Sequence, residues 1–247
     1  MDRRDFLKTV AVSGAAMTIQ RSEAMEILTQ AVNSTGKPDL VAVMGDEPEL
    51  MFQRAIAELG GMKQFVKSGQ KVVVKPNIGW DKVPELAGNT NPKLVAEIVK
   101  QCFAAGAKEV TVFDHTCDDW QKCYKNSGIE SAAKAAGAKV MPAHLESYYR
   151  PVDLSEGKNM KKAKIHEAIL NCDVWINVPI LKNHGGANLT IAMKNHMGIV
   201  WDRGYFHQND LQQCIADICT MQKKAVLNVV DAYRIMKTTQ AATASEP

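Results

Sequence analysis

The segment from Asn177 to Asp210 concentrates side chains that could do chemistry. Its sequence, NVPILKNHGGANLTIAMKNHMGIVWDRGYFHQND, contains three histidines, three cations and four glycines. Lysine and arginine bind carboxylates and phosphates through charge-assisted hydrogen bonds, and histidine exchanges protons near neutral pH. Paired glycines let the backbone approach a ligand closely. The segment therefore predicts an active or binding site, although no standard motif names its reaction.

Apolar runs rich in β-branched residues alternate with amphipathic segments along the chain. We predict strands at residues 40–44, 72–74, 110–113, 139–141, 174–178 and 226–230, and helices at residues 48–59, 92–105, 129–136, 163–171 and 210–222. The polar segment 146–162 is expected to be a surface excursion. Strands that are apolar throughout and separated by helices indicate a parallel sheet with both faces covered. The predicted fold class is α/β, with a mainly parallel sheet, helices on both faces and a single domain over residues 38–236.

Polar residues follow four of these strands where the strands end. They are Lys75 and Asn77, then Asp114, His115 and Cys117, then the segment from Lys182 to Gly186, and finally Asp231. Ligands of open parallel sheets bind beyond the carboxyl ends of the strands. We therefore expect a shared cleft of lysine, histidine and aspartate side chains at that edge.

Each residue of the expected cleft receives a role. The predicted catalytic residues are Asp114, His184 and Lys182, with Asp114 or His184 exchanging the proton. The predicted substrate-binding residues are Lys75, Asn77, Gly185, Gly186, Lys194, Asn195, His207 and Asp231. Ordinary structural roles compete with these: Asp114 could satisfy loop amides, Asp210 could cap a helix, and Asp231 could start a turn.

The sequence lacks the motifs that mark several well-known kinds of active or binding site. The sequence contains no GxGxxG after a strand, no GxxxxGK[ST], no HExxH, no zinc-spaced CxxC and no GxSxG. The alternative is a metal ion or iron–sulfur cluster held by Asp114, His115, Cys117 and His184. The cofactor is otherwise unknown from the sequence.

The N-terminus carries a targeting pattern. Arg3 and Arg4 begin a twin-arginine pattern, a mildly apolar run follows, and the small residues Ser22 and Ala24 suit cleavage after residue 24. We predict that residues 1–24 are a twin-arginine signal peptide, the alternative being an amphipathic helix. The protein would then meet the twin-arginine export machinery and be periplasmic. No apolar run is long enough for a transmembrane helix in the mature chain, and a net charge of +3 does not indicate nucleic acid as a partner.

Five motifs together resemble one known family. VVVKPNIGW, NTNPKLVAEIV, AGAKEVTVFDHTCDDWQKCYKNSGIE, the Asn177–His207 stretch and LNVVDAYRIM are similar to the family called domain of unknown function 362. That family includes twin-arginine-exported proteins and members associated with iron–sulfur modules, so the resemblance implies export and an iron–sulfur redox partner. The KPN, AGAKEV and NVPxLK pattern is also distantly similar to the N-terminal domain of nickel-pincer lactate racemases, which hints at hydroxy-acid or metal-cofactor chemistry.

The C-terminal end departs from the family pattern. The family continues with a further block, whereas residues 237–247, KTTQAATASEP, have the composition of a disordered tail. We therefore expect a C-terminally truncated product whose sheet is incomplete at that end.

Three functions fit the sequence. The first is an exported protein that binds or converts a small anionic substrate at the lysine, histidine and aspartate cleft. The second is a metal or iron–sulfur protein with a redox or accessory role. The third is a periplasmic binding protein that holds an anion without turnover.

Overall fold

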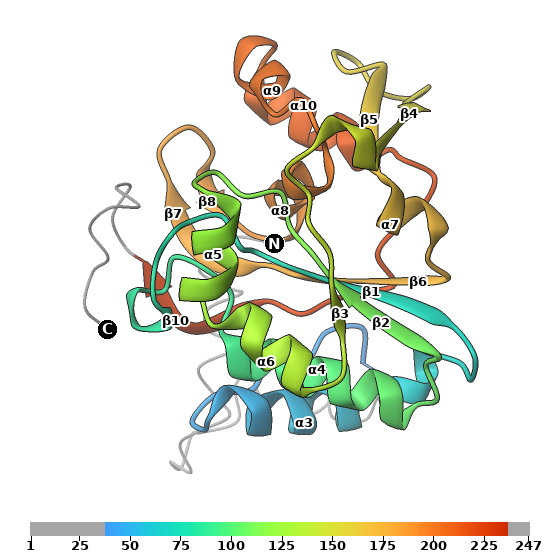
Figure 1. The fold of residues 1–247 in the computed structure, drawn as a ribbon, viewed down its shortest axis with the longest axis vertical. Helices are drawn as coiled ribbons and strands as arrows, with labels where there is room; N and C mark the ends of the chain where they lie inside the picture. The colour runs from blue at the N-terminus through green and yellow to red at the C-terminus, as the bar shows by residue number, and fades with distance from the viewer. Residues whose placement is uncertain (1–37, 237–247) are drawn as a thin grey trace, which may run out of the picture. The chain divides into compact units, whose positions relative to one another are not determined.

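The computed structural model describes residues 38–236, and a five-stranded parallel sheet organises them (Figure 1). The strand order is β3–β2–β1–β6–β9, and all four neighbouring pairs are parallel. The strands are β1 (Lys71–Pro76), β2 (Glu109–Val112), β3 (Lys139–Val140), β6 (Val174–Val178) and β9 (Leu227–Asn228). The α/β class and the parallel sheet expected from the continuous apolar runs are confirmed.

Successive residues of the central strands enter different hydrophobic cores. Val72 and Val74 of β1 pack into one core, and Val73 packs into the other. Both faces of the sheet are therefore buried. For this reason β1 and β6 show no alternation between apolar and polar residues.

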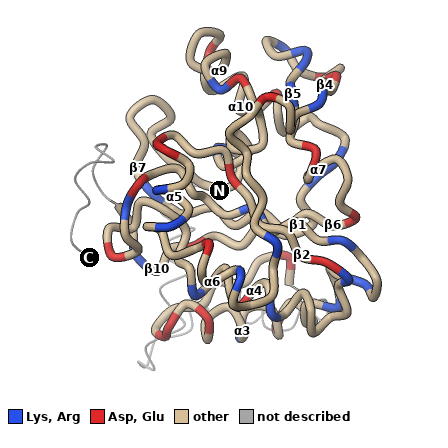
Figure 2. Tube along the Cα trace, viewed as in Figure 1, with Lys and Arg blue, Asp and Glu red and all other residues tan. Residues whose placement is uncertain are grey.

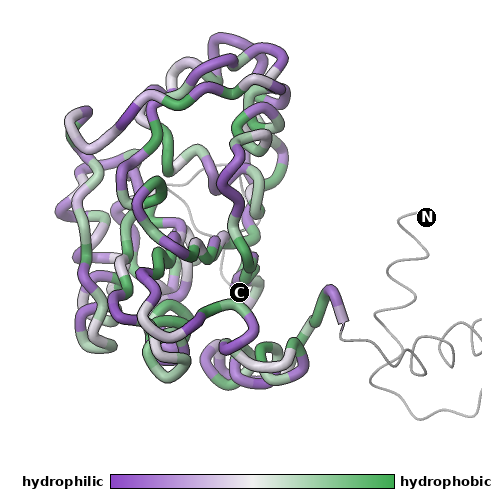
Figure 3. The backbone as a smooth tube through the Cα atoms, turned by 90° about the vertical axis from the view of Figure 1, so that its right-hand side faces the viewer, coloured by the Kyte–Doolittle hydropathy of each residue, from purple (hydrophilic) through white to green (hydrophobic). Residues whose placement is uncertain are grey.

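Different elements cover the two faces of this sheet (Figure 1). On one face lie α3 (Pro48–Glu58), α4 (Pro92–Ala104) and α6 (Ile129–Ala135), with α5 (Trp120–Asn126) preceding α6. On the other lie α7 (Glu167–Asn171), α8 (Ala192–Asn195), α9 (Gly204–Gln208), α10 (Leu211–Ile218) and the hairpin of β4 (Tyr149–Asp153) and β5 (Lys162–His166). Hydrophobic and hydrophilic stretches alternate along the chain that forms these layers (Figure 3).

The ends of α4 follow local rules. The Asn91 side chain accepts a hydrogen bond of 2.9 Å from the Lys93 amide, and Pro92 occupies the first turn. After the helix Gly106 has φ of 102°, and a Cβ there would lie 3.1 Å from the Ser68 Cα. The start and the stop predicted for this helix are both confirmed.

A second, three-stranded sheet continues the first beyond Pro179. It has the order β10–β7–β8 and comprises β7 (Ile180–His184), β8 (Asn188–Thr190) and β10 (Asp231–Met236). Strand β7 pairs with β8 in an antiparallel hairpin, whose tip contains Gly185 and Gly186. Lys182 and His184 therefore lie on a strand of their own, β7, which follows the predicted strand at residues 174–178.

Two expectations about secondary structure were wrong. Residues 163–166 belong to β5, because Ala163 and Ile165 alternate with exposed lysines against β4, and helix α7 begins only where His166 caps it. The segment 146–162, expected to be a surface excursion, contains the mostly exposed strand β4. Residues 40–44 form no strand, since Leu40 and Met44 are exposed and no neighbouring strand pairs with them in the described range.

Two predicted segments, the signal peptide at residues 1–24 and the tail at residues 237–247, lie outside the described residues. Export by the twin-arginine route therefore stays a prediction. Across residues 38–236, no helix combines the length and the apolar character that crossing a membrane requires. Basic and acidic residues are interspersed along the described chain (Figure 2).

Candidate functional site

A buried ion pair joins the ends of β1 and β2. The Lys75 Nζ atom lies 2.7 Å from the Asp114 Oδ1 atom, and the two side chains are 0% and 2% exposed. The other carboxylate oxygen of Asp114 accepts a hydrogen bond of 2.6 Å from the Ile78 amide. Burial lowers the pKa of Lys75, and the Asp114 charge opposes this shift. A charge buried this deeply is tolerated because it is paired and hydrogen-bonded.

The backbone of Gly198 covers this ion pair. Gly198 lies in a short 3-10 helix, His196–Ile199, that follows α8. A Cβ atom at this position would overlap Asp114 Oδ1 and lie 2.6 Å from Lys75 Nζ. The Gly198 carbonyl also accepts a hydrogen bond of 3.1 Å from the His115 amide. Only glycine, which has no Cβ atom, lets the backbone pass this close to the ion pair.

At the same edge of the sheet, Lys182 and four asparagine side chains form a series of hydrogen bonds in which each side chain donates to the next. Lys182 Nζ donates to Asn77 Oδ1 at 2.9 Å, and the Asn77 amide donates to Asn195 Oδ1 at 3.0 Å. Asn195 donates in turn to Asn177 at 2.8 Å, and Asn177 donates to Asn228 at 2.8 Å. Lys75 Nζ also donates to Asn195 Oδ1 at 3.0 Å. This series therefore connects both lysines.

A cavity of about 430 Å³, here called the lysine cavity, opens beside the ion pair. Ten of the residues that the sequence assigned to the site line it: Lys75, Asn77, Asp114, His115, Cys117, Lys182, His184, Lys194, Asn195 and His207. They come from the ends of β1 and β2, from β7, and from α8 and α9. The structure thus brings together residues that are up to 132 positions apart.

Lys182 and Lys194 set the electrostatics of the lysine cavity. Burial lowers the pKa of each lysine from its usual value to about 8. Within residues 38–236, neither ammonium group forms an ion pair with a carboxylate. Lys182 is 4% exposed and donates only to the neutral oxygens of Asn77 and Gly88. Lys182 is therefore a buried cation and Lys194 a half-buried one, and neither forms a direct ion pair with a carboxylate in the described range.

Sequence reasoning assigned no role to two further lining residues. Thr190 of β8 is 3% exposed, and its Oγ1 atom is buried without a hydrogen-bond partner in the described part of the chain. The Arg203 guanidinium donates to the carbonyls of His115 and Thr116 and lies 3.2 Å from Cys117 Sγ. Arg203 belongs to the cation-rich segment noted in the sequence, whereas no local signal marks Thr190.

His184 is held as a neutral hydrogen-bond donor. Its Nδ1 atom accepts hydrogen bonds from the amides of Gly186 at 3.2 Å and Ala187 at 3.0 Å. Burial lowers the pKa of His184 to about 4, and the nearby charges of Lys194, His207 and Lys182 add to the shift. The proton of the neutral ring therefore resides on Nε2. With Nδ1 occupied and Nε2 protonated, the imidazole donates a hydrogen bond and has no free nitrogen to act as a base.

His115 is likewise neutral, because burial and the Arg203 charge lower its pKa to about 4. Its Nδ1 atom lies 2.9 Å from the Val200 carbonyl.

Three predicted binding residues lie outside the lining of the lysine cavity. Gly185 and Gly186 form the exposed tip of the β7–β8 hairpin. The Asp231 carboxylate accepts hydrogen bonds from the Asn91 amide at 2.7 Å and the Tyr233 amide at 3.1 Å. Asp231 is the first residue of β10, so the Asn91 contact joins that strand to the N-cap residue of α4. Asp210 caps α10, as the structural alternative predicted.

The four residues of the metal alternative do not converge on one point. Asp114 contacts Lys75 and Ile78, and His184 Nδ1 faces two amides. His115 Nδ1 faces a carbonyl, and Cys117 faces Arg203. Across residues 38–236, no three His, Cys, Asp or Glu side chains are grouped so that they could hold a metal ion. These four residues are therefore not arranged to hold a metal ion or cluster.

Comparison with known proteins gives one family match and one curated relative. The model of the family described as "Domain of unknown function (DUF362)" matches residues 72–247. The thylakoid-associated protein sll1697 of Synechocystis sp. is 26% identical over 142 residues, which cover 58% of this chain and 43% of that protein. The chain thus spans less than half the length of this relative.

Two solved structures are similar in fold. A protein from Thermotoga maritima has a TM-score of 0.52 at 12% identity, covering 76% of this chain and 53% of that one. The lactate racemase apoprotein of Thermoanaerobacterium thermosaccharolyticum has a TM-score of 0.49 at 17% identity, covering 79% and 54%. The first likeness concerns the fold alone, and the second is too weak to add to it.

Replacing Gly198 tests how closely the backbone covers the ion pair. We expect Gly198→Ala to lower the free energy of unfolding by at least about 2 kcal/mol, because the added methyl group must displace the buried pair. Urea unfolding followed by circular dichroism measures the loss. Gly185→Ala is the matched control, since its Cβ would meet nothing within 4 Å. Equal stability of the two variants would contradict the close approach.

Asp114→Asn tests the ion pair itself. It leaves the Lys75 ammonium group buried without a counter-charge, and we expect a loss of about 3–5 kcal/mol. The double variant Lys75→Met, Asp114→Asn should recover part of that loss, because no isolated charge remains. Glu130→Gln breaks the exposed pair with Lys134 and should change stability little. If the double variant were no more stable than Asp114→Asn, charge pairing would not be the cause.

Proposed function

Because the chain belongs to the DUF362 family, whose description specifies no reaction, we propose from its site geometry that it binds a small organic anion in the lysine cavity. The acidic group of the ligand is a carboxylate or a phosphate. The observation that carries the proposal is that the ammonium groups of Lys182, which is buried, and Lys194, which is half-buried, line one cavity and form no ion pair with a carboxylate within residues 38–236. An anion between them supplies the missing charge.

The donors that remain free favour an oxyanion. An ammonium group has three N–H donors, and Lys182 uses two of them on Asn77 and Gly88. The Lys194 ammonium donates to no acceptor in the described range, and the Thr190 hydroxyl also lacks a partner there. The Nε2–H group of His184 adds a neutral donor. These donors suit an acidic group with two or three oxygens.

The Lys75–Asp114 pair does not bind the anion directly. Its charges compensate each other, and its hydrogen bonds hold Asn195 and, through it, Asn77. Asn77 then positions the Lys182 ammonium group. We therefore assign Lys75, Asn77 and Asn195 to positioning, and Lys182, Lys194 and Thr190 to contact with the anion.

Neutralising the two free lysines tests the proposal. We expect Lys182→Met and Lys194→Met each to weaken binding of methyl phosphate and of acetate by about ten-fold or more, since a charge-assisted hydrogen bond contributes about 1.5–3 kcal/mol. Isothermal titration calorimetry gives the dissociation constants. Lys100→Met, an exposed lysine on α4, is the matched control and should bind both anions as the unchanged protein does. If both cavity variants bound methyl phosphate and acetate as tightly as the unchanged protein does, the proposal would be contradicted.

Anion binding should also depend on pH in one direction. Since Lys182 and Lys194 have a pKa of about 8, both are charged below that pH and lose their charge as the pH rises through it. Methyl sulfate does not titrate in this range, so its affinity reports the protein alone. We expect its binding to weaken several-fold between pH 7 and pH 9.5.

Cys117→Ser serves as the background for this titration, because it removes the thiol that lines the same cavity as the lysines. An affinity that is constant across the range, or that rises with pH, would contradict the assignment of the lysines.

A further inference from the structure

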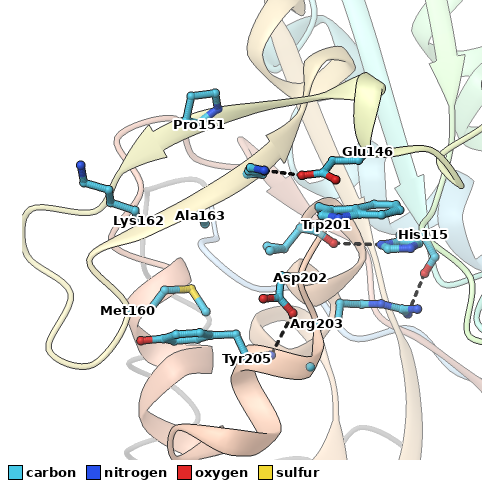
Figure 4. Close-up of a pocket in the computed structure, with 13 residues that line it drawn as sticks. His115, Glu146, Pro151, Met160, Lys162, Ala163, Trp201, Asp202, Arg203 and Tyr205 are labelled. Carbon is cyan, nitrogen blue, oxygen red and sulfur yellow. Dashed lines mark hydrogen bonds and ion pairs between the residues drawn. The ribbon is translucent and has the colours of Figure 1, made fainter.

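A second cavity, of about 750 Å³, adjoins the lysine cavity (Figure 4). His115, Arg203 and Gly204 line both cavities, so the two cavities meet along these residues. The second cavity extends from this border toward the β4–β5 hairpin, and we call it the aromatic cavity after Trp201 and Tyr205, which line it. Its volume lies in the range of pockets that hold an organic ligand.

Two ion pairs lie at the rim of the aromatic cavity, and the Asp202 carboxylate, which accepts a hydrogen bond of 3.1 Å from the Tyr205 amide, also lines it. Lys164 pairs with Glu146, and Lys162 lies 3.7 Å from Asp153. All four side chains are half or more exposed, which places them at the rim. Unlike the lysine cavity, this space therefore holds no desolvated cation that needs an anion.

The inner surface of the aromatic cavity is apolar and held in place. Met160 and Val200 line it and are buried. The Trp201 ring stacks on His115, with ring centroids 5.3 Å apart and planes 2° from parallel. The Tyr205 hydroxyl donates to the Asn159 carbonyl at 2.9 Å, which fixes its ring. Aromatic rings held in this way bind apolar groups at a low entropic cost.

Hydrogen bonds hold the residues at which the two cavities meet. Arg203 donates to the carbonyls of His115 and Thr116, and His115 Nδ1 contacts the Val200 carbonyl at 2.9 Å. Gly204 contributes no side chain at this border. A ligand bound in the lysine cavity therefore has the aromatic cavity beside it.

We propose that the aromatic cavity binds the planar, apolar body of the same organic anion whose acidic group lies between Lys182 and Lys194. The proposal rests on the proposed function, because the acidic group anchors the ligand. It narrows the ligand class from any small anion to an aryl-substituted carboxylic acid or phosphate ester. A flat ring system stacks against aromatic side chains and removes their surface from water.

Two pairs of probes test this inference by isothermal titration calorimetry. Methyl phosphate and 1-naphthyl phosphate share one acidic group, and acetate and 1-naphthylacetate share the other. We expect the naphthyl member of at least one pair to bind at least about ten-fold more tightly than its methyl counterpart. In Trp201→Ala and in Tyr205→Ala this gain should shrink several-fold, whereas the affinity for the methyl member should change less than two-fold.

Tyr233→Ala is the matched control, because this aromatic residue of β10 is partly exposed and lines neither cavity. Retained binding of the methyl probe shows that each variant is folded. Equal affinity within both pairs, or a naphthyl gain that survives both cavity substitutions, would overturn the inference while leaving the proposed function in place. If no probe bound the unchanged protein, the proposed function and this inference would both fail.

Discussion

The buried ion pair of Lys75 and Asp114 is the interaction on which the site depends. It fixes the ends of two neighbouring parallel strands at one point, and the Gly198 backbone packs directly on it. Without the pair, one strand end would present an isolated buried charge and the crossing chain would lose its support. The same lysine hydrogen-bonds Asn195, which passes the constraint to α8. The geometry of the lysine cavity follows from this single contact.

The amide chain from Lys182 to Asn228 extends that constraint across the sheet edge. Every donor in it points in the same direction, so each amide has only one orientation that satisfies both neighbours. The oxygen atoms face the lysines and the N–H groups face away from them. This arrangement stabilises positive charge at Lys75 and Lys182 without a carboxylate for the second lysine, and hydrogen bonds in a polarised series strengthen one another.

Local sequence pattern was sufficient for the sheet and for part of the site. Continuous apolar runs such as Val72–Val74 favour strands covered on both faces, although the run at residues 40–44 forms no strand. Residues that follow parallel strands meet at one edge of the sheet. The sequence pattern gave a wrong prediction where a contact between segments far apart in the chain determines the secondary structure. Residues 163–171 fit a helix until β4 is known to pair with their first half. Asp231 and Thr190 acquire their surroundings from segments far away in the chain, which spacing alone does not reveal.

Lys182 and Lys194 belong to regular structure, a strand and a helix, and not to a hinged loop. Lys182 is 4% exposed on its strand, and burial lowers the pKa of both lysines. Under the proposed function, an anion that binds in the lysine cavity stabilises the folded state by mass action. Thermal stability measured for this protein would then depend partly on the buffer, because the identity and concentration of the surrounding anions enter the folding equilibrium.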